Sequence, residues 1–206
     1  MILANGDRPS RALVEGLRAA SGLFIATDGA ADWLAALGIA PDVVLGDFDS
    51  VDEATRPRLA GAEWVHAPDQ EASDLDKALA HALERGADTL DVAGAVGGRL
   101  DHTLTAVALA VKYHRLCRLR LVTDTQQLWA VSGSAEVRGV PGDTVSLVPF
   151  GDADGVSVEG VRWPLVDEPL PAGSRGVSNS LIGPAARVRV ARGVVIVCLG
   201  RGPLAP

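Results

Sequence analysis

Two aspartates, Asp47 and Asp49, follow the apolar run of residues 43–46 with only Phe48 between them. If the chain is extended there, side chains alternate, so both carboxylates face one way and Phe48 faces the packed interior. Two like charges held together need a positive partner, and carboxylate oxygens are ligands that Mg²⁺ prefers. The pair therefore predicts a magnesium site, although Asp49 and Ser50 could simply cap the next helix.

Acidic residues also follow other apolar runs that have the composition of buried strands: Asp28, Asp74 and Asp101 each come shortly after one. In an open α/β sheet, ligands bind at the carboxyl ends of the strands, so we expect these acids along one edge. Lys77, three positions after Asp74, shares a helical face with it. This lysine forms either an ordinary exposed ion pair or part of the site.

The segment GGRLDH combines features that suit a phosphate group. Gly97 and Gly98 allow the backbone to approach a ligand closely, and Arg99 can hold phosphate with two hydrogen bonds. The helix that begins near Asp101 offers free N–H groups, and Asp101 can cap that helix, bind a metal or do both. Of the four histidines, which have no metal-ligand spacing, only His102 lies in such a segment. Acids, basic residues and glycines without a nucleophile–histidine pair favour phosphoryl chemistry.

Two different patterns organise the chain. Up to residue 125, apolar runs alternate with helical patterns, which is typical of a mostly parallel sheet with helices on both faces. Beyond it, β-rich runs are separated by Gly, Pro and Asp, and ARVRVARG alternates as a half-buried antiparallel strand does. We therefore predict an α/β fold in two domains: a catalytic domain over residues 1–125 and an all-β sandwich or barrel-like domain over residues 126–206.

Composition excludes several classes of protein. The net charge of −7 disfavours a nucleic-acid partner, which requires a basic surface. The sequence has no apolar run of the ~18 residues that a membrane span needs, and its N-terminus lacks the pattern of a secretory signal. Cys117 and Cys198 are isolated, so neither a disulfide framework nor a zinc site is expected. We expect a cytoplasmic protein that has no membrane partner.

Taken together, the motifs resemble the thiamine pyrophosphokinase family. They are TDGAADWL, PDVVLGDFDSV, PDQEASDLDKAL and GAVGGRLDHTL, then GVRWPL and SRGVSNSLIG, and they occur in the family's order over nearly the whole chain. The resemblance implies a catalytic domain, a thiamine-binding β-sandwich and a homodimer with shared active sites. It also implies Mg²⁺-dependent transfer of a pyrophosphoryl group from ATP to the hydroxyl of thiamine, with AMP as the other product.

The resemblance further implies roles for individual residues. The metal ligands would be Asp47, Asp49 and Asp74. The catalytic acids would be these three together with Asp28 and Asp101. ATP and its phosphates would contact Lys77, Gly97, Gly98, Arg99 and His102. Thiamine would contact Gln70, Trp163, Ser178 and Asn179, and Trp163 would stack on its pyrimidine ring across the dimer interface. The base that deprotonates the thiamine hydroxyl stays open between Asp28, Asp74 and Asp101.

Two residues depart from the family pattern. Ala30 stands where the motif has a second glycine, which is expected to narrow the approach of a ligand to the backbone beside Asp28. Ser73 replaces a threonine and keeps the hydroxyl.

Other functions fit part of the sequence. DFDSV also matches the nucleophile motif of haloacid-dehalogenase-like phosphatases, in which Asp47 would form an aspartyl-phosphate. Their later GDxxxD motif is incomplete here, because GDADGV lacks the final acid. A pyrophosphokinase for another heterocyclic alcohol, such as a hydroxymethylpterin, would share the acids, but RWPL and SNSL favour thiamine. A thiamine or nucleotide sensor is disfavoured because every expected charged position is filled.

Overall fold

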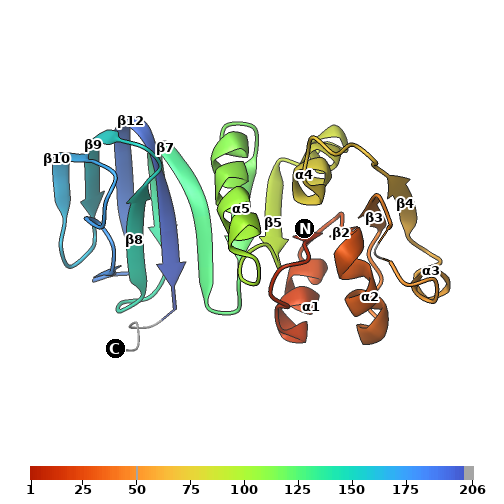
Figure 1. The fold of residues 1–206 in the computed structure, drawn as a ribbon. Coiled ribbons are helices and arrows are strands. Elements are labelled where there is room, and N and C mark those ends of the chain that lie inside the picture. The colour runs from red at the N-terminus through yellow and green to blue at the C-terminus, as the bar shows by residue number, and fades with distance from the viewer. Residues whose placement is uncertain (50, 202–206) are drawn as a thin grey trace. The chain divides into compact units, whose positions relative to one another are not determined.

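The structure is a computed structural model that describes residues 1–49 and 51–201. It divides into two compact units, one of residues 1–109 with 115–124, the other of residues 110–114 with the chain from 125 onward. The first is an α/β unit and the second is built mainly of long strands (Figure 1). The predicted fold class is therefore confirmed. None of the described helices combines the length and apolar character that a membrane span requires.

A parallel sheet forms the centre of the α/β unit. Its strands are β1 (Ile2–Leu3), β2 (Ile25–Thr27), β3 (Val43–Gly46), β4 (Glu63–His66), β5 (Thr89–Ala93) and β6 (Arg118–Val122). They pair in the order β6-β5-β1-β2-β3-β4, with every pairing parallel. The chain thus extends the sheet to one side of β1 first and then returns to build β5 and β6 on the other. Ligands of doubly wound sheets bind at such a switch point, outside the carboxyl ends of the strands.

Helices connect these strands: α1 (Arg11–Ala19), α2 (Asp28–Leu37), α3 (Thr55–Arg58), α4 (Asp74–Glu84) and α5 (Leu100–Tyr113). α1 and α2 lie side by side (Figure 1), and Val14 and Leu34 pack from them onto Leu3 and Ala26 of the sheet. α4 contacts β2 and β3. β2 leads directly into α2, and residues 67–73 and 94–99 lead from β4 and β5 into α4 and α5. The first residues of these helices lie near the carboxyl ends of the strands.

The second unit is a β-sandwich. Its strands are β7 (Gln126–Arg138), β8 (Thr144–Pro149), β9 (Ala153–Glu159), β10 (Leu165–Leu170), β11 (Asn179–Ser180) and β12 (Ala185–Gly200). β12 pairs antiparallel with β7 on both sides of a register shift between Val190 and Val195. The first half of β12 also pairs with β9, and the second half pairs with β8. Two sheets thus share β7 and β12 and enclose a core of valines and leucines.

The bend in β12 depends on Gly193. The apolar runs at residues 186–191 and 193–200 read as separate strands in the sequence, whereas the structure joins them. Gly193 has a φ of 86°, and a Cβ there would lie 2.4 Å from the carbonyl oxygen of Asp152. Only glycine allows both the left-handed backbone and this close approach, so the strand can bend without ending.

Candidate active site

The carboxyl ends of β1, β2, β3 and β5 and the first residues of α4 and α5 surround a cleft of about 360 Å³. Several residues that the sequence singled out line it: Asp28, Asp47, Asp49, Asp74, Gly97, Arg99 and His102. They come from separate segments of the chain. The parallel sheet brings them together because its strands all end at the same edge.

Three carboxylates form the centre of this cleft. Asp28, Asp47 and Asp49 each offer an oxygen, and these atoms all lie within 4.8 Å of one another. Asp28 is buried; its carboxylate accepts hydrogen bonds from the backbone N–H groups of Gly29 at 2.6 Å and Phe48 at 3.0 Å. Gly46 leaves room for it, since a Cβ there would lie 2.3 Å from the Asp28 Cγ.

Crowding of charge changes the acidity of these groups. Burial raises the pKa of Asp28; the Phe48 N–H opposes this rise, and the negative charges of Asp74 and Asp47 add to it. The charge of Asp47 raises the pKa of Asp49, while a hydrogen bond from the Asp49 backbone lowers the pKa of Asp47. Clustered carboxylate oxygens that repel one another are a donor set that fits a hard divalent cation such as Mg²⁺.

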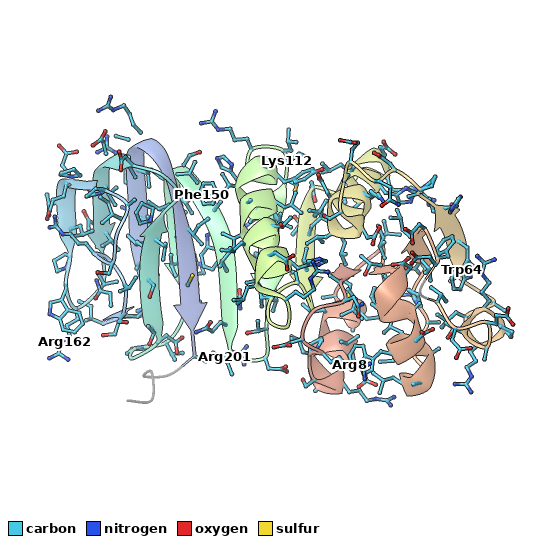
Figure 2. All side chains as sticks on the ribbon, in the orientation of Figure 1. Arg8, Trp64, Lys112, Phe150, Arg162 and Arg201 are labelled. Atoms are coloured by element: carbon cyan, nitrogen blue, oxygen red, sulfur yellow. The ribbon has the colours of Figure 1, made fainter. Side chains whose placement is uncertain are left out.

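The backbone between Asp47 and Asp49 is not extended, so this part of the prediction was wrong. Phe48 adopts a left-handed conformation with a φ of 66°. The resulting turn points the Phe48 N–H at Asp28 and the Asp49 N–H at Asp47. The Phe48 ring leaves the cleft and packs edge-on against Trp64 of the edge strand β4, with ring centres 5.3 Å apart (Trp64 is labelled in Figure 2). The carboxylates therefore converge through a turn.

Asp74 is held by the start of α4. Ser73 caps this helix, because its hydroxyl accepts a hydrogen bond from the Asp76 N–H at 3.3 Å. The ammonium of Lys77 lies 3.2 Å from the Asp74 carboxylate and donates to the Ala67 carbonyl at 2.9 Å. The Lys77 side chain is only 11% exposed. Lys77 thus joins the end of β4 to α4 and orients Asp74, and it is not among the residues that line the cleft.

The predicted phosphate segment forms a tight turn before α5. Gly97 and Gly98 have φ angles of 85° and 64°, which favour glycine. Arg99 donates two hydrogen bonds to Asp101, at 3.1 and 2.5 Å. This contact lowers the pKa of Asp101 to about 2. Asp101 is therefore an ionised partner of Arg99, and its low basicity makes it a poor proton acceptor.

Gln70 reaches the edge of the acid cluster. Its side-chain amide lies 3.5 Å from the Asp47 carboxylate and 3.4 Å from the carbonyl of Pro68. These are long contacts, so the amide remains available to a ligand in the cleft.

Sequence reasoning missed several residues that line the cleft: Asn5, Gly6, Thr27 and Thr105. Asn5 and Gly6 follow β1 after Ala4, so the strand-end rule that selected the aspartates would have found them. Asn5 packs against the start of α2, since a Cβ on Gly29 would lie 2.2 Å from its amide nitrogen. Ala30, by contrast, is buried against the core of α1 and α2. The expected narrowing beside Asp28 therefore does not arise from its methyl group.

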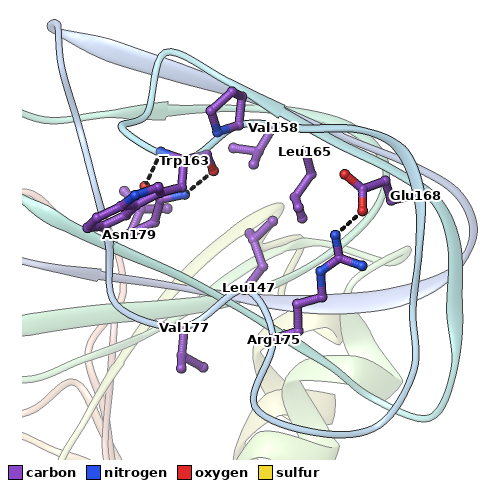
Figure 3. Close-up of a pocket in the computed structure, with 11 residues that line it drawn as sticks. Leu147, Val158, Trp163, Leu165, Glu168, Arg175, Val177 and Asn179 are labelled. Carbon is purple, nitrogen blue, oxygen red and sulfur yellow. Dashed lines mark hydrogen bonds and ion pairs between the residues drawn. The ribbon is translucent and has the colours of Figure 1, made fainter.

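A second cavity, also of about 360 Å³, lies within the β unit (Figure 3). Its walls combine polar groups with apolar side chains that include Leu147, Val158 and Leu165, and the exposed indole of Trp163 lies at one end. An ion pair between Glu168 and Arg175 lies at the other end (Figure 3). Apolar walls with one aromatic face and a few polar groups suit a small flat heterocycle.

Ser178 stands beside this cavity in an uncommon conformation. Its φ is 60°, and its backbone N–H donates to the Ser146 hydroxyl at 2.9 Å. Among the described residues, only Phe48, Asp167 and Ser178 have a positive φ without being glycine. Two of these lie in segments selected from the sequence for chemical reasons. Strained backbone is often retained where it orients functional groups.

A stability measurement tests the charge crowding. We expect Asp49→Asn to raise the melting temperature of the metal-free protein near neutral pH. The pKa of the Asp49 carboxyl in the folded protein is raised above the ordinary 3.8. The protonated group therefore favours the folded state at pH values below 3.8, and this contribution is lost as the pH rises through the folded pKa. The gain should therefore shrink as the pH falls towards 3.8.

The matched control for this experiment is Glu53→Gln, which removes one exposed negative charge outside the cluster. Melting curves recorded with a chelator across the acidic range would compare the two variants. An equal gain from both would mean that the general net charge, and not the pairing with Asp47, sets the effect.

Comparison with known proteins gives a consistent result in sequence and structure. The family model described as thiamin pyrophosphokinase, catalytic domain, matches residues 14–121, and the vitamin B1 binding domain of the same family matches residues 135–195. Thiamine pyrophosphokinase of Bacillus subtilis is 30% identical over 183 residues, which cover 85% of this chain and 86% of that protein.

Solved structures agree over almost the whole chain. A crystal structure of the Bacillus subtilis enzyme has a TM-score of 0.83 at 26% identity and covers 97% of both chains. Thiamin pyrophosphokinase from Candida albicans shares the fold with a TM-score of 0.82 at 14% identity, over 97% of this chain and 88% of that one.

An acidic, glycine-lined cleft at the switch point of a parallel sheet is typical of enzymes that bind and transfer phosphate groups. Given the two matching domain models and the Bacillus relative, the chain belongs to the thiamine pyrophosphokinase family. The resemblance that the sequence motifs carried is confirmed.

Proposed function

We propose that the protein transfers the pyrophosphoryl group of ATP to the hydroxyl of thiamine, giving thiamine diphosphate and AMP with Mg²⁺ as cofactor. The observation that carries this proposal is the convergence of Asp28, Asp47 and Asp49 in a cleft that Arg99 also lines, in a chain of this family. A triphosphate bound there would meet a guanidinium, glycine backbone and the first turns of helices, which are all suited to anions.

Asp47 and Asp49 are the proposed metal ligands, with Asp74 completing the set and Asp28 close enough to contribute. Bound Mg²⁺ would neutralise charge on the phosphates and polarise the oxygens of the transferred group. The residues themselves fix the geometry. The Phe48 turn holds the Asp47–Asp49 pair, and Lys77 holds Asp74.

Asp28 is the strongest candidate for the base that takes the proton of the thiamine hydroxyl. Burial raises its pKa, which brings its basicity closer to neutral pH. Asp101 is a weak candidate because Arg99 lowers its pKa to about 2. Asp74 is already paired with Lys77.

The division of roles proposed for the domains assigns ATP and metal to residues 1–125 and thiamine to residues 126–206. Trp163 and Ser178 are the proposed thiamine contacts in the second of these.

We also propose a homodimer with shared active sites. Leu100 and Leu104, in the first turns of α5 just after Arg99, are 79% and 71% exposed, and Trp163 is 56% exposed. Apolar side chains this exposed beside ligand sites are typical of surfaces that a partner covers. The use of ATP and thiamine is consistent with a cytoplasmic location.

The reaction is tested by incubating purified protein with ATP, Mg²⁺ and thiamine and identifying the products. We expect AMP and thiamine diphosphate in equal amounts. ADP would show single phosphoryl transfer and contradict the proposal. Turnover of a hydroxymethylpterin in place of thiamine would support a related pyrophosphokinase, and binding without any turnover would support a sensor.

Shared active sites are tested by mixing two variants that each have little activity at low thiamine concentration, Asp47→Asn and Trp163→Ala. If each site combines the acids of one subunit with the tryptophan of the other, a mixed dimer contains one site with both residues intact. Subunit exchange should then restore activity that neither variant has alone. If each site lies within one chain, the mixture will stay as inactive as its parts.

A further inference from the structure

The side chain of Asn179 is occupied by contacts to Trp163. Its amide oxygen accepts hydrogen bonds from the backbone N–H groups of Trp163 at 3.0 Å and Ser180 at 2.9 Å. Its amide nitrogen donates to the Trp163 carbonyl at 2.6 Å (dashed lines in Figure 3). The residue is only 9% exposed. Both acceptor positions and one of the two N–H donors are thus already used.

The indole of Trp163 is exposed and yet held in place. The guanidinium of Arg162 lies over the ring, 4.8 Å from its centre. The Arg162 backbone N–H donates to the Ser180 carbonyl at 2.9 Å, and an isolated bridge joins Val161 to Leu181. The segment around Trp163 is therefore bound along its length to the segment around Asn179. A cation thus lies over the ring, and the indole lines the cavity.

We propose that Asn179 and Arg162 are positioning residues that preorganise Trp163 as the stacking wall of the cavity in the β unit. Asn179 fixes the backbone of the tryptophan, and Arg162 fixes its ring. This inference rests on the proposed function for the identity of the ligand, thiamine. It changes the role expected for Asn179, which acts through Trp163 and does not contact thiamine itself.

The physical benefit is entropic. A large exposed side chain must give up rotational freedom when a ligand stacks on it, and this cost weakens binding. A ring that is already fixed avoids that cost. Because Arg162 already places a cation over the indole, the indole suits a neutral ring better than a second cation. This preference agrees with the stacking on the neutral aminopyrimidine of thiamine that the family resemblance implies.

A double-mutant cycle distinguishes the two roles of Asn179. We expect Asn179→Ala to raise the KM for thiamine about tenfold, the effect of losing a well-ordered aromatic contact, with the KM for ATP unchanged. In a Trp163→Ala background, Asn179→Ala should then have no further effect, because the residue it positions is gone. Additive effects of the two substitutions would mean that Asn179 contacts thiamine directly, and would overturn the proposal.

A second measurement does not depend on turnover. Protein labelled with 5-fluorotryptophan gives one fluorine resonance for each tryptophan, and the signal missing from Trp163→Phe identifies that of Trp163. In the free protein, Asn179→Ala and the exposed Arg162→Gln should each shift or broaden this signal, whereas Arg189→Gln on β12 should leave it unchanged.

The exposed Arg162 keeps the proposal testable if Asn179→Ala fails to fold. If the Trp163 signal is unchanged in Arg162→Gln, Arg162 does not position the ring. If the Trp163 signal is unchanged in Asn179→Ala, Asn179 does not position it. If the signals change but the wild-type protein makes no thiamine diphosphate, the proposed function fails and the positioning of Trp163 stands.

Discussion

Replacing Asp47 with asparagine is expected to lower the turnover number for thiamine diphosphate about a thousandfold, as for loss of a principal electrostatic contact in a transition state. Asparagine keeps the size of the side chain but offers a single neutral oxygen to the metal. The Asp47 side chain is partly exposed to solvent. Removing its charge leaves only two carboxylates in the cluster, Asp28 and Asp49, and so lowers the repulsion there. The fold should therefore survive the substitution, and the loss should reside in the reaction.

Melting curves separate metal binding from folding in this variant. In the wild-type protein, Mg²⁺ should raise the melting temperature because it binds only the folded state. In Asp47→Asn this increase should largely disappear, because the variant binds Mg²⁺ weakly. Glu71→Gln, which removes an exposed charge nearby, should retain both the increase and the turnover. Near-normal turnover of Asp47→Asn would remove Asp47 from the metal site.

The sequence carried enough information to locate the cleft. Each of the predicted acids follows an apolar strand, and parallel strands must end at one edge, so Asp28, Asp47 and Asp74 had to approach one another. The same reasoning applies to Asn5 and Gly6 at the end of β1. They were missed because a short strand followed by uncharged residues gives a weak chemical signal.

Side-chain direction was harder to predict than position. Lys77 was expected to contact phosphate, but a carbonyl at the end of β4 and the adjacent Asp74 hold its ammonium. Neither contact is visible until β4 and α4 are placed side by side. The turn at Phe48 has the same origin, since an aromatic residue adopts a positive φ only when tertiary contacts compensate for the strain.

The pairing of Asn179 with Trp163 could not be predicted for a related reason. The two residues are 16 positions apart in the chain, in a region rich in Gly and Pro. Their contact follows from the antiparallel bridge between Val161 and Leu181, which no local pattern specifies. Sequence motifs therefore identified which residues matter in the β unit, and the geometry indicates what one of them does.

The Phe48 ring connects the acid cluster to the outer part of the sheet, so its removal should affect catalysis from outside the cleft. It packs edge-on against Trp64, and the guanidinium of Arg56 lies 5.2 Å from the centre of Phe48 and 4.7 Å from that of Trp64. This aromatic anchor fixes the left-handed residue between Asp47 and Asp49. Without the ring, the two carboxylates would lose their common orientation.

We expect Phe48→Ala to weaken Mg²⁺ binding by about tenfold to a hundredfold, as loss of a supporting residue around a metal site does. The free energy of unfolding should fall by about 2 kcal/mol, because the ring is only half-buried. Titration calorimetry with Mg²⁺ and the nucleotide would measure the first effect, and denaturant unfolding the second.

Trp64→Ala separates the two consequences of losing the anchor. It removes packing from the same cluster but leaves Phe48 and the turn in place, supported by Arg56. It should therefore lower stability by a similar amount with a smaller loss of Mg²⁺ affinity. If Phe48→Ala lowers stability but binds Mg²⁺ as tightly as the wild-type protein, the turn is held by the backbone hydrogen bonds to Asp28 and Asp47 alone. The ring would then contribute to the fold and not to the site.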